Sequence, residues 1–206
     1  MGGVLDPGPA AVASPDGYGC GHDQLGVGVS IGLSGDRVRL RPTVAGDRDA
    51  LVTIRATPEV HRRWGGEDLV AEFKEDLADE DVVRFTIELA ADDRIIGLVQ
   101  YVEEDDPQYR HASIDIYLDP AVHRRGLATE TLTLIVDHLL HDRRHHRLTI
   151  DPAADNLAAI ACYRAIGFEP VGILRAYERQ PDGRWADGLL MDLVADDVDR
   201  ASGRPD

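Results

Sequence analysis

The 206-residue chain has few of the residues that build disulfide scaffolds or membrane spans. Its two cysteines, Cys20 and Cys162, are too few for a disulfide framework. It has no apolar run of about 18 residues, the length that crosses a bilayer as a helix. Its first residues lack the basic stretch and the apolar core of a signal peptide. They also lack the Ser or Thr that a myristoylation signal requires. We therefore expect a cytoplasmic protein with no membrane partner.

Positive charge is also scarce. The chain has 22 Lys and Arg against 38 Asp and Glu, a net charge of −16, which opposes binding to nucleic acid. Basic residues gather at 62–63, 123–125 and 143–147, whereas acids dominate 67–81 and the part of the chain from Asp187 onward. Most of these acids are solvated surface. The separation nevertheless suits a protein that holds an anionic cofactor at one place and a polycationic substrate at another.

Composition divides the chain into three parts. Residues 1–35 are rich in Gly and Pro and show no hydrophobic period, so we expect a flexible N-terminal tail. Residues 36–195 have the length of one domain with a substantial core, and we expect 196–206 to be a frayed C-terminal tail. Four histidines within 138–146 resemble a metal cluster in composition. They lie beside several arginines at a helix end, where repulsion opposes a cation, so we expect no metal site.

Residues 112–168 carry the clearest pattern of strands and helices. Residues 113–118 alternate polar and apolar, as a half-buried strand does, and the next segment repeats apolar residues every three or four positions, as a helix does. A short strand follows at 147–150, and a second helix ends at Gly167. Outside this region, the sequence predicts strands at 38–41, 83–89, 94–101, 171–179 and 188–194 and helices at 47–55, 58–63 and 69–77.

The turn before the first of these helices is suited to binding an anion. It reads His-Arg-Arg-Gly-Leu-Ala from His123 to Ala128, so that it carries two arginines and small residues that let an anion approach the backbone. Free N–H groups and the positive end of the helix dipole converge at such a turn. An ordinary Arg-rich surface turn is the alternative, because short Gly motifs often match by chance.

The second helix carries two further candidates. Asn156 and Tyr163 are seven residues apart, so they lie on one face about 10 Å apart along the helix axis. Asn156 could equally be only an N-cap, and Tyr163 only a half-buried aromatic residue. Cys162 has no obvious His and acid partners in the sequence, which favours a packed thiol over a nucleophile.

Together these residues resemble the acetyl-CoA-binding core of the GNAT N-acetyltransferase superfamily. The pyrophosphate loop of that family follows Gln/Arg-x-x-Gly-x-Gly/Ala, and the segment from His123 to Ala128 departs from it only at its first residue. The family also carries an Asn and a Tyr on the following helix, which Asn156 and Tyr163 match. The resemblance implies an α/β (α+β) fold with a mixed, mostly antiparallel central sheet, splayed between its fourth and fifth strands and flanked by helices.

Two segments are similar to a subgroup, the aminoglycoside 6′-N-acetyltransferases. They are Trp-Gly-Gly-Glu from Trp64 to Glu67 and Asp-Pro-Ala-Ala-Asp-Asn from Asp151 to Asn156. The resemblance extends over roughly 38–194. In this subgroup, helices equivalent to 47–55 and 58–63 cover the acceptor site. Trp64 could then form a wall for a sugar ring, although a core or surface Trp is an equal alternative from the residues alone.

The resemblance assigns roles to individual positions. The implied cofactor-binding residues are Tyr117, Leu118, His123, Arg124, Arg125, Gly126, Leu127, Ala128, Thr129, Asn156, Ala159 and Tyr163. The implied substrate-binding residues are Trp64, Glu67, Gln100, Asp115, Asp151 and Asp187. Asp151 is fixed by the Asp-Pro motif, whereas Asp187 is placed by a gapped match to an Asp-Gly near the C-terminus.

Asp115 and Tyr163 are the predicted catalytic residues. Acetyl transfer to an amine needs a carboxylate that binds the ammonium form and takes a proton, directly or through water. Asp115 lies mid-strand between two isoleucines, although polar Ser113 and Tyr117 leave an exposed sheet face as the alternative. By resemblance, Asp115 matches an acceptor-site Asp. Tyr163 would protonate the leaving sulfur, and backbone amides after Asp115 would steady the carbonyl oxygen.

We therefore predict an acetyl-CoA-dependent N-acetyltransferase that releases CoA. Its predicted acceptor is a primary amine of a polycationic small molecule, foremost the 6′-amine of an aminoglycoside, which would confer antibiotic resistance. Transfer would occur by direct attack in a ternary complex, on a monomer or a homodimer. The alternative acceptors are a protein N-terminus, a polyamine or a siderophore-precursor lysine. A non-catalytic acyl-CoA-binding module ranks last, because it would have no need of Asp115 and Tyr163.

Overall fold

The computed structural model describes residues 32–180 and 183–196. Its strands are β1 (Leu33–Ser34), β2 (Val38–Pro42), β3 (Val82–Leu89), β4 (Ile95–Glu104), β5 (His111–Leu118), β6 (Arg147–Ile150), β7 (Glu169–Arg179) and β8 (Trp185–Val194). Its α-helices are α1 (Arg48–Arg55), α2 (Pro58–Trp64), α3 (Leu69–Ala78), α4 (Leu127–Asp137) and α5 (Leu157–Ile166). Short 3-10 segments cover Ala45–Asp47 and Pro120–Val122, and a π-helical turn, His138–Asp142, extends α4.

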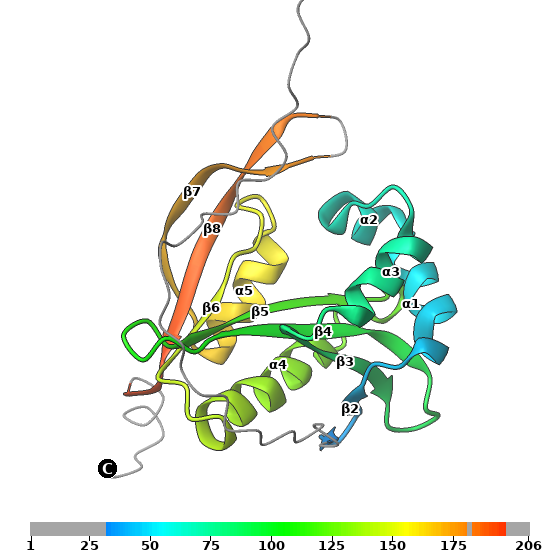
Figure 1. Cartoon of the computed structure of the whole chain (residues 1–206), viewed down its shortest axis with the longest axis horizontal. Coiled ribbons are helices and arrows are strands. Elements are labelled where there is room, and N and C mark those ends of the chain that lie inside the picture. Colours follow the sequence, from blue (N-terminus) through cyan, green and yellow to red (C-terminus); the bar gives the residue numbers. More distant parts are fainter. Residues whose placement is uncertain (1–31, 181–182, 197–206) are drawn as a thin grey trace, which may run out of the picture.

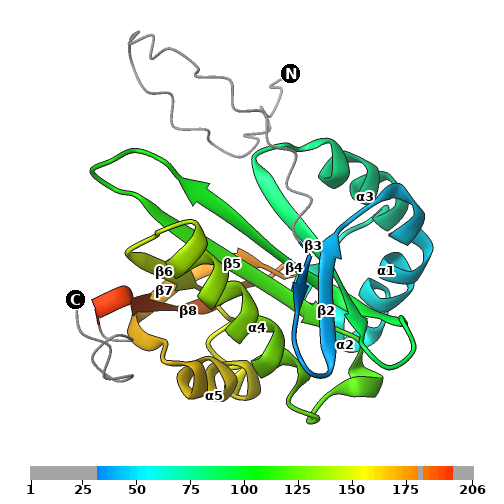
Figure 2. The same ribbon diagram turned by 90° about the horizontal axis from the view of Figure 1, so that it is seen from below.

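The strands form one sheet in the order β1-β2-β3-β4-β5-β6-β8-β7. Its neighbouring strands are antiparallel except for β5 and β6, which run parallel. α4 and α5 cover one face of the sheet, and α1 and α3 lie on the other face (Figures 1 and 2). This arrangement confirms the predicted mixed, mostly antiparallel sheet flanked by helices. The resemblance implies a splay between the fourth and fifth strands. Counted from β2, the first strand that the sequence predicted, these two strands are β5 and β6.

The parallel pairing of β5 with β6 is very short. Only two residue pairs are in register, Ala112 with Leu148 and Ser113 with Thr149. The hydroxyls of Ser113 and Thr149 share a hydrogen bond of 2.8 Å at this last pair. Beyond it the two strands separate. Asp115 lies two residues after Ser113, and Asp151 lies two residues after Thr149. Because side chains alternate along a strand, Asp115 and Asp151 lie on the face that carries Ser113 and Thr149.

Alternation along β5 gives the two faces of the sheet different cores. Ile114 and Leu118 are buried in the larger cluster, which contains the apolar side chains of α4 and α5. Tyr117 belongs to a second cluster with Leu51 of α1 and Phe73 of α3. Asp115, on the same face as Tyr117, therefore points to the side that α1 and α3 cover. The predicted alternation of residues 113–118 is confirmed.

Both ends of α5 are as the sequence predicts. The Asn156 side chain accepts a hydrogen bond of 3.3 Å from the Ala159 N–H, and Gly167 ends the helix with a positive φ of 113°. One strand is not anticipated, because Leu33 and Ser34 of β1 pair with Leu40 and Arg39. Two residues are too few to show a period, so the sequence placed them in the N-terminal tail.

Several predictions fall outside the described residues. They include residues 1–31 of the N-terminal tail with Cys20, and 197–206 of the C-terminal tail. Residues 181–182, between the last two predicted strands, also lie outside the described residues. Of the helices in the part of the chain that the structure describes, none combines the length and hydrophobicity that a membrane span requires.

Two of the clustered histidines bind carboxylates. His145 Nε2 lies 2.6 Å from Glu103, and His138 Nδ1 lies 2.8 Å from Asp142. Across residues 32–180 and 183–196, no group of three or more His, Cys, Asp or Glu could hold a metal ion.

A buried carboxylate joins the start of α1 to the sheet. Asp47 accepts two hydrogen bonds of 2.7 Å from the Arg41 guanidinium, one of 2.9 Å from the Val44 N–H and one of 2.8 Å from the Thr86 hydroxyl. Burial alone would raise the pKa of Asp47, but these donors outweigh it and hold the pKa below its ordinary value. The carboxylate is therefore more stable ionised in the folded protein than in the unfolded chain.

We predict that Asp47→Ala lowers the free energy of unfolding by about 2 kcal/mol or more at pH 7, since it leaves buried charge-assisted donors without an acceptor. The pKa of Asp47 in the folded protein lies below its value of about 4 in the unfolded chain. The stability that the Asp47 carboxylate contributes is therefore complete above about pH 4, and it is lost as the pH falls through the folded pKa.

Chemical denaturation of both proteins between pH 7 and pH 3 measures this difference. Asp49→Ala, which removes a carboxylate that is 85% exposed at the start of the same helix, is the matched control. An equal loss in the control, or a difference that grows on acidification, would contradict the prediction.

Candidate active site

A cavity of about 280 Å³ opens where β5 and β6 separate. Its walls come from α2, β5, β6 with the loop that follows it, α5 and β7. The lining residues are Arg63, Trp64, Asp115, Ile116, Ile150, Asp151, Pro152, Ala153, Asn156, Tyr163, Tyr177 and Glu178. The cavity thus brings together five residues that the sequence selected: Trp64, Asp115, Asp151, Asn156 and Tyr163.

The Asp115 side chain is exposed to the cavity, and the protein atoms packed around it displace part of its hydration. This desolvation is the main cause of its raised pKa, and the negative charge of Asp151 raises the pKa further. A hydrogen bond from Gln100, its cross-strand partner on β4, opposes both effects in part. Asp115 is therefore a stronger base than an isolated carboxylate in water, and a cation placed between Asp115 and Asp151 would relieve their repulsion.

Tyr163 is buried at the inner end of the cavity, with 7% of its surface exposed. Burial is the main cause of its raised pKa, and the nearby Cys162, Asp115 and Asp151 add to the shift. Its hydroxyl therefore keeps its proton at neutral pH and can donate it. Asn156 uses its side-chain oxygen as the N-cap of α5, which leaves its amide NH₂ group as a donor within the cavity.

Three ionisable lining residues, Arg63, Tyr177 and Glu178, are not among the site residues predicted from the sequence. The Tyr177 hydroxyl donates to Asp151, and this hydrogen bond, with burial, raises the pKa of Tyr177 to about 12. Burial also raises the pKa of Glu178. Arg63 of α2 donates to Asp155 across 2.5 Å, at the loop before α5. None of the three lies in a motif, and only the folded chain places them at the cavity.

Three of the predicted substrate-binding residues do not line this cavity. Gln100 lines a smaller pocket under α1 and α3, of about 20 Å³, which is room for about one water molecule. Glu67 is exposed, and its N–H donates to Glu72. The Asp187 carboxylate accepts a hydrogen bond of 2.8 Å from the Ala176 N–H of β7.

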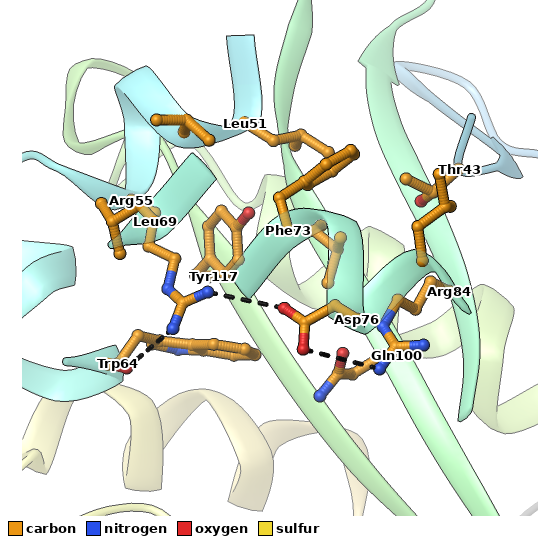
Figure 3. Close-up of a pocket in the computed structure, with 13 residues that line it drawn as sticks. Thr43, Leu51, Arg55, Trp64, Leu69, Phe73, Asp76, Arg84, Gln100 and Tyr117 are labelled. Atoms are coloured by element: carbon orange, nitrogen blue, oxygen red, sulfur yellow. Dashed lines mark hydrogen bonds and ion pairs between the residues drawn. The ribbon is translucent and has the colours of Figure 1, made fainter. Parts of the chain in front are cut away.

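Two residues that line the smaller pocket, Arg55 and Tyr117, hold Trp64 in position (Figure 3). Arg55 donates to the Trp64 carbonyl across 3.3 Å and pairs with Asp76 at 3.6 Å. The Trp64 indole meets the Tyr117 ring edge-on, with centroids 4.8 Å apart and an interplanar angle of 75°. Since Trp64 also lines the larger cavity, it is both a packed residue and a cavity wall.

The predicted cofactor-binding positions at the end of β5 differ in what they can offer. The side chains of Tyr117 and Leu118 are buried in the two cores, so only their backbone could meet a cofactor. His123 donates from Nε2 to the Leu118 carbonyl across 3.1 Å, which ties the start of the loop back to β5.

The loop from His123 to α4 exposes backbone donors. Arg124 and Gly126 adopt positive φ angles of 61° and 72°. The first hydrogen bond of the helix runs from the Glu130 N–H to the Gly126 carbonyl at 3.1 Å, so the amides of residues 127–129 have no acceptor within the helix. With exposed Arg124 and Arg125 beside them, these donors fit the diphosphate of a CoA-type cofactor.

Arg37, which the sequence analysis did not select, braces this loop. Its guanidinium donates to the carbonyls of Arg125 at 2.7 Å and Gly126 at 3.2 Å. Glu130 of α4 holds Arg37 in turn, by accepting from its Nε at 2.7 Å and from its backbone N–H at 2.7 Å. Arg37 thus occupies the Arg125 carbonyl and gives the Gly126 carbonyl a second donor beside the Glu130 N–H, so that neither carbonyl oxygen is free to repel an anion.

We predict that Arg37→Ala weakens the binding of CoA about tenfold or more, because the Arg125 carbonyl loses its charged donor and the Gly126 carbonyl keeps only its helix hydrogen bond. Isothermal titration with CoA measures the affinity. Arg39→Ala, which removes an arginine of β2 that is 41% exposed and paired with Asp93, is the control. Equal affinities for the two variants would contradict a bracing role for Arg37.

A second prediction concerns the two cavity carboxylates. Asp151→Asn should lower the pKa of Asp115, because it removes a negative charge that opposes ionisation, while the larger contribution from burial remains. Titration followed by carboxyl ¹³C NMR, with the signal assigned by its loss in Asp115→Asn, measures the shift. An unchanged or higher midpoint in Asp151→Asn would show that the two carboxylates do not interact.

Comparison with known proteins identifies relatives of the whole domain. The acetyltransferase (GNAT) domain family matches residues 37–169, more than half of the chain. Aminoglycoside N(6′)-acetyltransferase type 1 of Klebsiella pneumoniae is 30% identical over 186 residues, covering 79% of this chain and 89% of that protein. The ribosomal protein bS18-alanine N-acetyltransferase of Escherichia coli is 37% identical over 79 residues, covering 38% of this chain and 52% of that protein.

A solved structure shows the same fold. Spermidine N-acetyltransferase from Vibrio cholerae, in complex with CoA and spermine, superposes with a TM-score of 0.68 at 22% identity. The match covers 79% of this chain and 98% of that one.

Proposed function

Since the chain belongs to the GNAT acetyltransferase family, whose members use acetyl-CoA, we propose that its acceptor is a primary amine of a polycationic small molecule. The 6′-amine of an aminoglycoside fits this description. The observation that carries the proposal is the charge of the cavity. Asp115, Asp151 and Glu178 line it, and Arg63 is the only basic side chain among the lining residues. Such a cavity attracts a cation that carries several amines.

Two further observations support a sugar as the acceptor. Trp64 presents its indole to the cavity, held by Tyr117 and by Arg55, and an aromatic face can pack against a sugar ring. An aminoglycoside 6′-acetyltransferase is among the relatives that match most of the chain.

Asp115 acts on the amine. The acceptor arrives as an ammonium ion, which must lose a proton before it can attack. The raised pKa of Asp115 makes this carboxylate a better proton acceptor than an isolated carboxylate in water, and Asp151, held by Tyr177, gives the ammonium group a second counter-ion. The two carboxylates would orient the amine and then take its proton, directly or through water.

The other side of the cavity acts on the acetyl group. Bound acetyl-CoA supplies this group as a thioester. Past Ser113, the backbone of β5 is no longer paired with β6, so its N–H groups on that edge can donate to the carbonyl oxygen. Tyr163, protonated at neutral pH, can give its proton to the leaving sulfur. Holding both reactants in one cavity supplies much of the remaining acceleration.

Direct transfer needs no cysteine. Cys162 faces Thr129 of α4, with Sγ and Oγ1 3.4 Å apart, and it does not line the cavity. A thiol packed between two helices is not placed to carry an acetyl group, so Cys162→Ser should retain the turnover of the wild type.

The proposal is tested by release of free CoA thiol from acetyl-CoA with three acceptors side by side: kanamycin, spermidine and an alanyl peptide without charged side chains. Fastest turnover of kanamycin would support the aminoglycoside assignment. A protein N-terminus is the second candidate, favoured by the match to the bS18-alanine acetyltransferase, and turnover of the peptide alone would replace our proposal with it. Binding of CoA without turnover of any amine would indicate an acyl-CoA-binding module.

We predict that Asp115→Asn lowers kcat about a hundredfold or more, because the amine loses its proton acceptor, while CoA binds with unchanged affinity. Steady-state kinetics and CoA titration on the same preparation separate the two effects. A wild-type kcat in this variant would remove Asp115 from the mechanism.

Tyr163→Phe should slow the chemical step about tenfold or more, because the leaving sulfur loses its proton donor while the ring and its packing remain. Single-turnover measurements report this step apart from product release. If the single-turnover rate matches that of the wild type, another group protonates the sulfur.

A further inference from the structure

β7 contains an irregularity beside the cavity. Its register against β8 shifts between Leu174 and Glu178, and Ala176 adopts a positive φ of 49°. Tyr177 and Glu178 follow directly after this irregularity, and both line the cavity. A bulge bends its strand and re-aims the side chains that follow, and bulges are common next to active sites.

Two residues of β8 stabilise this bulge. The Asp187 carboxylate accepts a hydrogen bond of 2.8 Å from the Ala176 N–H, and its backbone carbonyl accepts another of 2.8 Å from Ala154, in the loop after β6. Gly188 makes room for the bulge, because a Cβ atom at this position would lie 2.9 Å from the Tyr177 ring. β8 therefore fixes where Tyr177 and Glu178 point.

The bulge adds two functions to the cavity wall. Tyr177 holds Asp151 through its hydroxyl. Glu178 brings a third carboxylate, on a different wall from Asp115 and Asp151. The ionisable side chains whose charges act on Glu178 are Arg63, which lowers its pKa, and Asp151 and Asp115, which raise it. Tyr177, its neighbour on β7, also interacts with its charge. The β7–β8 hairpin that carries Glu178 rises beside α5, opposite α2 (Figure 1).

We propose that the β7 bulge is the acceptor-specificity element: it places Glu178 as the counter-ion of a second ammonium group of the acceptor, and Asp187 is the positioning residue that holds the bulge. The inference rests on the proposed function, since only a polycationic acceptor has a second ammonium group to bind. It also gives Asp187 a role different from the direct substrate contact that the resemblance implies.

The test compares four variants on kanamycin, spermidine and an alanyl peptide whose only cation is its N-terminal ammonium. Glu178→Gln should raise KM for the polycationic acceptors about tenfold, change kcat by less than about threefold and leave the peptide unaffected. Glu169→Gln makes the same change on the same strand outside the cavity, and should leave all three acceptors unaffected.

The two Asp187 variants separate positioning from direct binding. Asp187→Ala should raise KM as Glu178→Gln does, because the Ala176 N–H loses its acceptor. Asp187→Asn should restore most of the wild-type KM, since an amide oxygen also accepts from an N–H. If Asp187 bound the substrate through its charge, the Asn variant would be as impaired as the Ala variant.

The outcomes distinguish this inference from the proposed function. Preference of the wild-type enzyme for the peptide would overturn both. Preference for kanamycin or spermidine, with Glu178→Gln behaving as Glu169→Gln does, would keep the proposed function and overturn the role of Glu178. An Asp187→Asn variant as impaired as Asp187→Ala would overturn the positioning role.

Discussion

The separation of β5 from β6 after two residue pairs is the constraint on which the rest of the site depends. It opens the sheet at the cavity, it frees the backbone edge of β5, and it leaves Asp115 and Asp151 at its mouth. Parallel strands also need a crossover between them, and here α4 provides it. The loop that begins this crossover therefore lies just past the end of β5, the same end at which the cavity opens. One feature of topology thus supplies both a place for an anion and a place for an amine.

The two halves of the site use charge in opposite ways. The loop before α4 combines helix amides with exposed Arg124 and Arg125, while Arg37 occupies two loop carbonyls. The cavity is acidic, and its walls raise the pKa of Asp115 by excluding water. Each half is therefore complementary to one reactant, and a net charge of −16 does not prevent the binding of an anionic cofactor, because the local charge decides.

Local patterns in the sequence predicted most of the fold, and the family resemblance selected five residues that the fold brings to one cavity. Alternation placed Asp115 on its face of β5, and turn chemistry located both ends of α5. The missing residues depend on contacts that no local pattern records. Arg37 is identified by a partner 93 positions away in the sequence, Glu130, and Glu178 lines the cavity directly after an irregularity of β7 that no local pattern marks. Likewise, Gln100 was assigned to the substrate by resemblance, but the register of β4 against β5 places it beside Asp115, at a different pocket.

The most direct test of this account is a crystal structure of the protein with both CoA and kanamycin bound. The account predicts that the reactive amine lies between the carboxylates of Asp115 and Asp151, with a sugar ring against Trp64 and the diphosphate of CoA on the amides before α4. An amine bound elsewhere, for example beside Asp76 and Arg84 in the smaller pocket, would contradict it.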